Sequence, residues 1–310
     1  MAGCLTLALS TTACADPKDP TPTPAASGAS VAAGNHTDRV RAQKVDSVAA
    51  RVPAPVRDRG ELRVVTISNG VPPLAFMADD NKTVSGAEID IAQLVADVLG
   101  LRIAVEQSSW ENLFLAVKSG KYDAAFSNIT VTAQRGQLYD FATYRTDSLA
   151  WEVAADSKVT AIQKPADIAG LTVGVGSGST QEKILLDWVS QVKTAGLPEA
   201  KIQYYQSQAD YWLALKSGRI QAFFGPHSLS AYHVLVAKET KLVGVYEGTS
   251  RGHIGAMTTK GSGLADAIAA ALNELIANGK YAEVLKRWGL EHEAVSKSEA
   301  NLFPSASPSS

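Results

Sequence analysis

Apolar residues between residues 110 and 126 follow first a helical and then a strand pattern. The spacing i, i+3, i+4 and i+7 marks one helix face and is carried by Trp110, Leu113, Phe114 and Val117. Gly120 follows at a position where helices commonly end on a left-handed residue. Residues 122–126 then form a short apolar run, which is typical of a buried strand. The pattern predicts a helix, a glycine stop and a strand in close succession.

The same unit occurs a second time in residues 211–224. A Lys-Ser-Gly stop again separates a helical pattern from an apolar run, and Gly218 stands 218 − 120 = 98 residues after Gly120. A second pair of segments agrees, because residues 60–67 resemble residues 169–175. An offset of this length is that of a domain and is too long for a solenoid repeat. The chain therefore predicts two similar lobes.

Strands and helices alternate through both lobes, which predicts an α/β fold with mostly parallel sheets and helices on both faces. Two amphipathic helices near residues 264–275 and 281–288 follow the second unit but have no counterpart after the first. We therefore expect the chain to return to the first lobe at its end. In sheets of this kind, ligands bind beyond the carboxyl ends of the strands.

Two segments after predicted strands are suited to hold an anion. The first is a run of hydroxyl and amide side chains that includes Ser127, Asn128 and Thr130 and leads to Arg135. The second is the glycine-rich junction 174–182, where Ser179 or Thr180 can cap the following helix. The junction lacks the Lys-Ser/Thr ending and the glycine spacing of phosphate loops, so an ordinary strand-to-helix loop is the alternative.

Composition excludes several function classes. The net charge of −2, with 19% charged residues, gives no reason to expect nucleic acid as a partner. Both cysteines lie within the first fourteen residues, so the folded part has neither a disulfide framework nor a cysteine nucleophile. No serine is flanked by glycines at −2 and +2, and the five histidines show no metal-ligand spacing on one helix face. We expect no cofactor and no metal.

The two ends of the chain differ in composition from the rest. Residues 1–14 resemble a bacterial lipoprotein signal peptide in which Cys14 receives the lipid, although no basic residue precedes the apolar core. Cys4 also has a lipobox-like context, but apolar sequence follows it. Residues 15–55 are expected to form a disordered tether, with a short helix broken at Pro53 and Pro55 as the alternative for residues 39–57. Residues 293–310 are expected to form a flexible tail.

A series of short motifs between residues 60 and 289 resembles the extracellular solute-binding proteins of family 3, which serve amino-acid ABC importers. The motifs are Gly-x-Leu-Arg-Val at 60–64, Pro-Pro-Leu at 72–74, Gly-Ala-Glu-Ile-Asp at 86–90, Trp110, Ser-Gly-Lys-Tyr-Asp at 119–123, Thr-Val-Thr-Ala-Gln-Arg at 130–135, Gly-Ser-Thr-Gln-Glu at 178–182 and Lys-Arg-Trp-Gly at 286–289.

The resemblance implies a periplasmic-binding-protein-like (type II) clamshell that closes by a hinge on a ligand in the cleft. The first lobe would comprise residues 56–146 and 249–292, and the second lobe residues 147–248. The family resemblance also implies that the protein delivers its ligand to an ABC permease. Together with the lipoprotein-like signal, it leads us to expect a monomer that is lipid-anchored at the extracytoplasmic face of the cell membrane.

The resemblance also assigns roles to individual residues. Arg135 would bind the ligand's α-carboxylate through its two-pronged guanidinium, assisted by Thr130. Ser179 and Thr180 would bring a helix N-terminus of the other lobe to the same carboxylate. The remaining implied contacts, at the side-chain end of the pocket or nearby, are Trp110, Ser127, Asn128, Ser68 and Asn69.

The chain departs from the family at the position that usually binds the ligand's ammonium group. Amino-acid binders place an aspartate just after the second-lobe strand, whereas residues 224–227 read Phe-Gly-Pro-His. A buried ammonium without an acceptor costs on the order of several kcal/mol. Either Glu88, Asp147 or Asp210 substitutes, or the ligand is not a free α-amino acid. His227 is a candidate hydrogen-bond partner for such a ligand.

Two other functions compete with solute binding. Cyclohexadienyl dehydratases share the implied fold and need one acid in the cleft, for which Glu88 is the candidate. A sensor or scaffold subunit is the third alternative. The sequence favours a binding protein that is not an enzyme.

Overall fold

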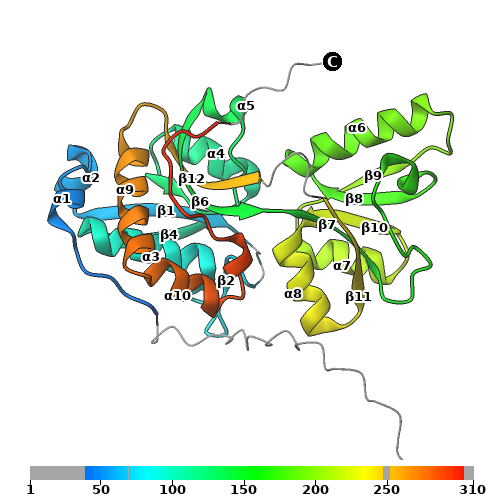
Figure 1. The fold of residues 1–310 in the computed structure, drawn as a ribbon, viewed down its shortest axis with the longest axis horizontal. Helices are drawn as coiled ribbons and strands as arrows, with labels where there is room; N and C mark the ends of the chain where they lie inside the picture. The colour runs from blue at the N-terminus through cyan, green and yellow to red at the C-terminus, as the bar shows by residue number, and fades with distance from the viewer. Residues whose placement is uncertain (1–38, 69, 71, 247–251, 304–310) are drawn as a thin grey trace, which may run out of the picture. The chain divides into compact units, whose positions relative to one another are not determined.

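The structure is a computed structural model that describes residues 39–68, 70, 72–246 and 252–303. Two five-stranded sheets form the centres of two lobes (Figure 1). The chain passes from the first sheet to the second between β6 and β7, and it returns between β11 and β12. Shorter elements accompany the two sheets: α1 (Asp46–Ala49), α2 (Ala54–Arg59), β2 (Phe76–Met77), β3 (Val84–Ser85), α5 (Ala133–Gly136), η2 (Pro165–Ile168) and η3 (Glu291–Glu293).

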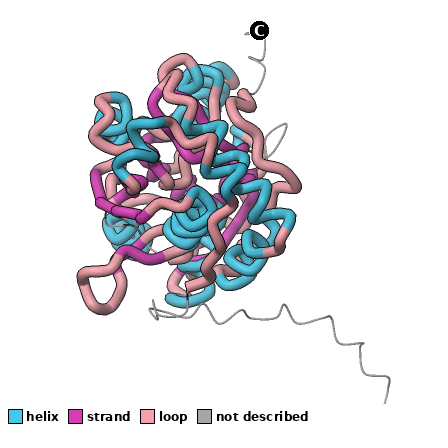
Figure 2. Tube along the Cα trace, turned by 90° about the vertical axis from the view of Figure 1, so that its left-hand side faces the viewer, coloured by secondary structure: helices cyan, strands magenta, loops and turns pink. Residues whose placement is uncertain are grey.

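The first lobe has the strand order β4-β1-β5-β12-β6. β1 pairs parallel with β4 and β5, and β12 pairs antiparallel with β5 and β6. Because side chains alternate along a strand, Leu62 and Val64 pack with α3, α9 and α10, whereas Val65 packs with α4. Figure 2 faces this lobe and shows helices lying outside the strands. The elements are β1 (Glu61–Ile67), α3 (Ala87–Leu99), β4 (Arg102–Ser108), α4 (Trp110–Lys118), β5 (Ala124–Ala125), β6 (Tyr139–Asp147), β12 (Gly252–Thr259), α9 (Leu264–Ala277) and α10 (Lys280–Arg287).

The second lobe repeats this arrangement in the strand order β11-β7-β10-β8-β9. β8 pairs parallel with β9 and β10, and β7 pairs antiparallel with β10 and β11. Phe224 stacks on Trp151 with 4.2 Å between ring centroids on one face of the sheet, while Phe223 stacks on Tyr211 on the other. The elements are β7 (Leu149–Ala154), β8 (Thr172–Gly176), α6 (Thr180–Thr194), β9 (Lys201–Tyr205), α7 (Gln208–Lys216), β10 (Ala222–Pro226), α8 (His227–Ala237) and β11 (Thr240–Tyr246).

The predicted parallel pairing holds for β4, β1 and β5 in the first lobe and for β9, β8 and β10 in the second. The strands that carry the chain between the sheets, β6, β7, β11 and β12, pair antiparallel instead. The sequence repeat also appears in the structure. Gly120 and Gly218 adopt φ values of +74° and +71° after α4 and α7, and Ser109 and Ser207 cap the starts of these helices.

The N-terminal segment 39–55 is ordered in the structure. We predicted a disordered tether over residues 15–55, but residues 39–55 pack against the first lobe. Val40, Val48 and Val52 are buried in its core, and the Val45 N–H donates to the Val98 carbonyl over 3.0 Å. The valines recur every three to five residues, so this segment buries an apolar stripe despite its polar composition.

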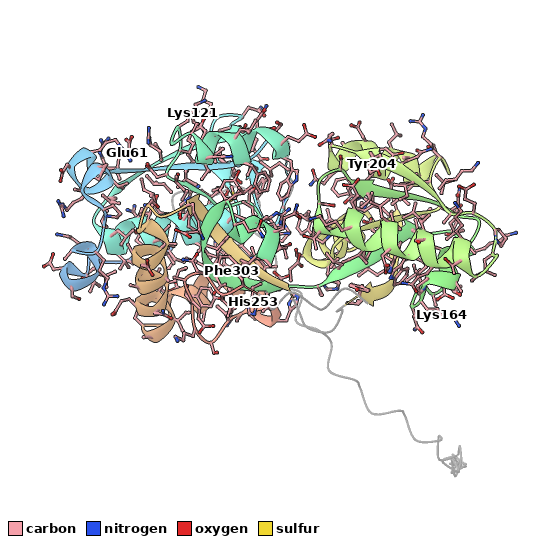
Figure 3. The ribbon with its side chains drawn as sticks, turned by 90° about the horizontal axis from the view of Figure 1, so that it is seen from above. Glu61, Lys121, Lys164, Tyr204, His253 and Phe303 are labelled. Atoms are coloured by element: carbon pink, nitrogen blue, oxygen red, sulfur yellow. The ribbon has the colours of Figure 1, made fainter. Side chains whose placement is uncertain are left out.

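Residues 293–303, which belong to the predicted flexible tail, are likewise ordered. β6 is an edge strand, and the tail covers it: the Thr143 N–H donates to the Glu299 carbonyl, and the Asn301 N–H donates to the Phe141 carbonyl. Phe303 lies against Phe141 at 6.3 Å between ring centroids, and Figure 3 labels it on the first lobe. The sequence pattern missed this contact because pairing along an open sheet edge needs no apolar periodicity.

Two kinds of feature are absent from the described residues. None of the helices there has the length and apolar character needed to span a membrane. The same residues contain no cluster of three or more His, Cys, Asp and Glu side chains arranged to hold a metal ion.

Candidate functional site

A cavity of roughly 980 Å³, including the part open to solvent, lies between the two lobes. It lies beyond the carboxyl ends of the parallel strands, where this class of sheet places ligand sites. First-turn or N-cap residues of five helices line it, at least one from each of α3, α4, α6, α7 and α8, including Glu88, Trp110, Thr180, Gln208 and Pro226. The partial positive charge at these helix ends favours an anion in the cavity.

Arg135 is the first-lobe residue best placed to bind that anion. Thr132 is the N-cap of α5, and its hydroxyl accepts the Arg135 N–H. The Arg135 Nη1 donates to the Thr130 carbonyl over 2.8 Å. The guanidinium carbon lies 5.5 Å from the Trp110 ring centroid and 5.3 Å from that of Phe114. No carboxylate of the described residues lies within ion-pair distance of Arg135 in the structure. Burial without such a partner lowers the pKa of Arg135 to about 10, so the guanidinium is charged at neutral pH.

The start of α6 faces Arg135 from the second lobe. The Arg135 Nη2 lies 3.5 Å from the Gly178 carbonyl, two residues before the helix begins. Ser179 caps α6 by accepting the Glu182 N–H over 3.1 Å, and the Glu182 carboxylate accepts the Gly178 N–H over 2.6 Å. Gly178 has a φ of +70°, a conformation that glycine adopts readily. The two predicted anion-holding segments therefore meet at one end of the cavity.

Glu88 lies at the cavity wall but is already paired. Its side chain is fully buried, one carboxylate oxygen accepts from Arg145 Nη2 at 2.5 Å, and the other accepts from the Tyr144 hydroxyl. Arg145 also pairs with Glu293 and donates to Asn128 Oδ1 over 2.6 Å. Although burial alone lowers its pKa, the charges of Glu293 and Glu88 raise the pKa of Arg145 well above the usual value.

Asp147 lies next to this network and does not line the cavity. It accepts from Asn128 Nδ2 over 3.3 Å, and burial together with the negative charge of Glu293 raises its pKa to about 7. Asp210, the other proposed ammonium acceptor, accepts from the Ser207 hydroxyl in the first turn of α7 and also does not line the cavity. Of the three acids proposed from the sequence, the structure brings only Glu88 to the cavity wall.

The raised pKa of Asp147 predicts a pH dependence of folding stability. In the folded state Asp147 ionises near pH 7, whereas an aspartate in the unfolded chain ionises near pH 3.9. The folded state therefore holds the extra proton between these values, so the free energy of unfolding falls as pH rises from about 4 to about 7 and levels off above 7. We expect the free energy of unfolding of Asp147→Asn, relative to the wild type, to increase by about 1–4 kcal/mol between pH 4 and pH 8. Urea denaturation at both pH values measures this, and an equal difference at both would contradict it.

Residues 63–291 match the family model of the bacterial extracellular solute-binding proteins, family 3. The chain belongs to this family. The match confirms the resemblance seen in the motifs of residues 60–289, and the two-lobed clamshell that the resemblance implied is the fold of the protein.

Relatives and solved structures give the same result. The chain is similar to the L-cystine-binding protein TcyJ of Escherichia coli (strain K12), with 26% identity over 75% of this chain and 84% of the relative. It is equally similar, at 26% identity over 84% of each chain, to the arginine-binding protein ArgT of Corynebacterium glutamicum. A solved structure of an ancestral arginine-binding protein bound to arginine matches with a TM-score of 0.66 and 28% identity, over 74% of this chain and 98% of that chain.

Within this solute-binding protein, most of the residues singled out from the sequence line the cavity: Trp110, Ser127, Asn128, Thr130, Arg135, Ser179, Thr180 and Glu88. Ser68 and His227 do not line it. The Ser68 N–H continues the pairing of β1 with β4 by donating to the Ser108 carbonyl, so Ile67 takes the position at the cavity. His227 begins α8 and contacts the His292 ring edge-on at 5.8 Å. Asn69 and Cys14 lie outside the described residues.

The sequence reading missed much of the second-lobe wall. This wall includes Tyr205, Gln206, Ser207, Gln208, Tyr211, Phe223, Phe224, Pro226 and Leu229. The repeat contains a signal that would have identified one of these residues. Gln208 stands 208 − 110 = 98 residues after Trp110 and occupies the same first helical position. No periodicity distinguishes the aromatic residues of this wall from ordinary core residues.

Proposed function

We propose that the protein captures an amino acid or an amino-acid-like small carboxylate in the cleft between its lobes and delivers it to an ABC permease. The observation that carries this proposal is Arg135, a charged and largely desolvated side chain without a carboxylate partner among the described residues. A ligand carboxylate would supply that partner. The names of the relatives, which bind cystine and arginine, support amino acids as the class from which to begin.

The proposed binding contacts come from both lobes. Arg135 would grip the carboxylate with its two-pronged guanidinium, a geometry that lysine does not offer. Because the Ser179 hydroxyl already caps α6, the second lobe would contribute backbone N–H groups of the first helical turn and Thr180. A ligand that contacts both lobes binds the closed state better than the open state, so it favours closure.

The dehydratase alternative finds no support in the cleft. It required Glu88 as a catalytic acid, but this carboxylate is fully buried and engaged by Arg145 and Tyr144. Glu88 is also the only acidic residue among the described residues that line the cavity. The protein is therefore proposed to bind its ligand without chemical turnover.

A thermal-shift screen over amino acids, their N-modified forms and small carboxylates tests the proposal. A ligand present at 100 times its Kd stabilises the protein by about 2.7 kcal/mol. For a protein of this size, that corresponds to a rise in Tm of roughly 5 °C. Calorimetry of the hits should show saturable binding, with the ligand recovered unchanged. A screen in which no carboxylate raises the Tm would count against the proposal.

The lipid anchor and the monomeric state of the protein go beyond what its family membership shows, and they are proposals. The family is extracellular by its description. We propose that Cys14 carries a lipid that anchors the protein to the extracytoplasmic face of the membrane, and that the protein is a monomer. In a bacterial host fed labelled palmitate, Cys14→Ser should abolish labelling, whereas Cys4→Ser should retain it. The reverse pattern would move the anchor to Cys4.

A further inference from the structure

Among the described residues, the side chains that line the cavity offer a ligand cation no carboxylate that is free of other partners. Arg135 and Glu88 are the two charged side chains among the described residues that line it. Arg145 pairs with Glu88, and the Tyr144 hydroxyl occupies its second oxygen. Arg135 is therefore the one charged side chain of the described lining residues that has no ionic partner there.

The second-lobe wall makes the site still less suited to a cation. Pro226 lies at the cavity where β10 ends, and it is the N-cap of α8. Proline has no side-chain acceptor, and no side chain caps α8. The starts of α6 and α7 reach the same cavity. Three helix N-termini with partial positive charge thus reach this wall of the cavity, which disfavours an ammonium group there.

The rest of this wall is largely apolar or aromatic. Phe223 and Tyr211 stack face to face, with 3.5 Å between ring centroids and 4° between ring planes. Leu229 adds an aliphatic side chain, and Gln206 and Gln208 add neutral amides. Such a surface suits an uncharged ligand body with a few hydrogen-bonding groups.

From these three observations we infer that the ligand is a monocarboxylate with a neutral hydrogen-bonding group in place of the α-ammonium. An N-acylated amino acid, a 2-hydroxy acid and a 2-oxo acid share this chemistry. The inference rests on the proposed function, since it assumes that Arg135 binds the carboxylate. It excludes free α-amino acids, including arginine, as the preferred ligand.

Matched compounds with the same side chain test the inference. Calorimetry would compare L-phenylalanine, L-leucine and L-glutamine with their N-acetyl derivatives and their 2-hydroxy-acid and 2-oxo-acid analogues, and would add L-arginine. For at least one side chain, a neutral analogue is expected to bind at least 100-fold more tightly than the free amino acid. If a free amino acid binds best, the inference fails while the proposed function stands. If none of these compounds and no carboxylate of the wider screen binds, the proposed function itself fails.

A designed reversal of specificity provides the second test. Pro226→Asp places a carboxylate at the cavity wall, and Pro226→Asn is its uncharged control of similar size. Both replacements suit the N-cap of α8, since aspartate and asparagine are preferred there. We expect Pro226→Asp to raise the affinity for the free amino acid at least 10-fold and to lower the affinity for the N-acetyl derivative. Pro226→Asn should change neither affinity by more than about 3-fold. If the ratio of the two affinities is the same in both variants, the inference is overturned.

Discussion

Arg135→Ala is expected to weaken ligand binding at least about 30-fold. The guanidinium is the only positively charged side chain among the described residues that line the cavity, and truncating one partner of a desolvated charge pair costs about 2–5 kcal/mol. Calorimetry with the best compound from the screen measures the loss. Arg135→Lys keeps the charge but loses the two-pronged geometry, so its affinity should fall between those of the alanine variant and the wild type.

The same substitution should not destabilise the unliganded protein. Arg135 has no carboxylate partner among the described residues, and burial lowers its pKa, so removing it relieves a desolvation penalty at the cost of its contacts with Trp110 and Phe114. The Tm of the unliganded variant should therefore stay within about 3 °C of wild type. Arg219→Ala, at an exposed arginine of the second lobe, is the matched control and should bind normally. Unchanged affinity in Arg135→Ala would contradict the site assignment.

Arg145→Met should produce the largest loss of stability. Arg145 is fully buried, and it pairs with both Glu88 and Glu293 next to Asp147. Removing one partner of a buried ion pair leaves an uncompensated charge, which costs about 3–5 kcal/mol. Urea denaturation at pH 8 should show this loss in the free energy of unfolding.

A combined variant separates charge from packing. Adding Glu88→Gln and Glu293→Gln to Arg145→Met removes both paired carboxylates, so a substantial part of the lost stability should return. The two glutamine replacements in an otherwise wild-type chain are the control, since they leave Arg145 buried without its ionic partners. If Arg145→Met costs less than about 1 kcal/mol, the network does not contribute to stability as its geometry indicates.

The sequence determined those features of this protein that depend on local pattern. The repeated helix, Lys-Ser-Gly stop and strand predicted two similar lobes, because a helix face and a buried strand are visible within ten to fifteen residues. Motif spacing around Arg135 and Ser179 predicted two anion-holding segments, because both follow directly on a strand. These segments line one cavity, since the carboxyl ends of parallel strands meet at the same edge of a sheet.

The tertiary structure alone decided which acids are available to a ligand. Glu88 is bound by a residue 57 positions away, and Glu293 reaches the same arginine across 148 positions, so neither pairing leaves a local sequence signal. The C-terminal tail that covers β6 also leaves no local sequence signal. Neither does the position of His227, which contacts His292 and does not line the cavity. Local pattern fixes where elements form, but the charge of a site depends on which side chains neutralise one another after residues distant in sequence are brought together.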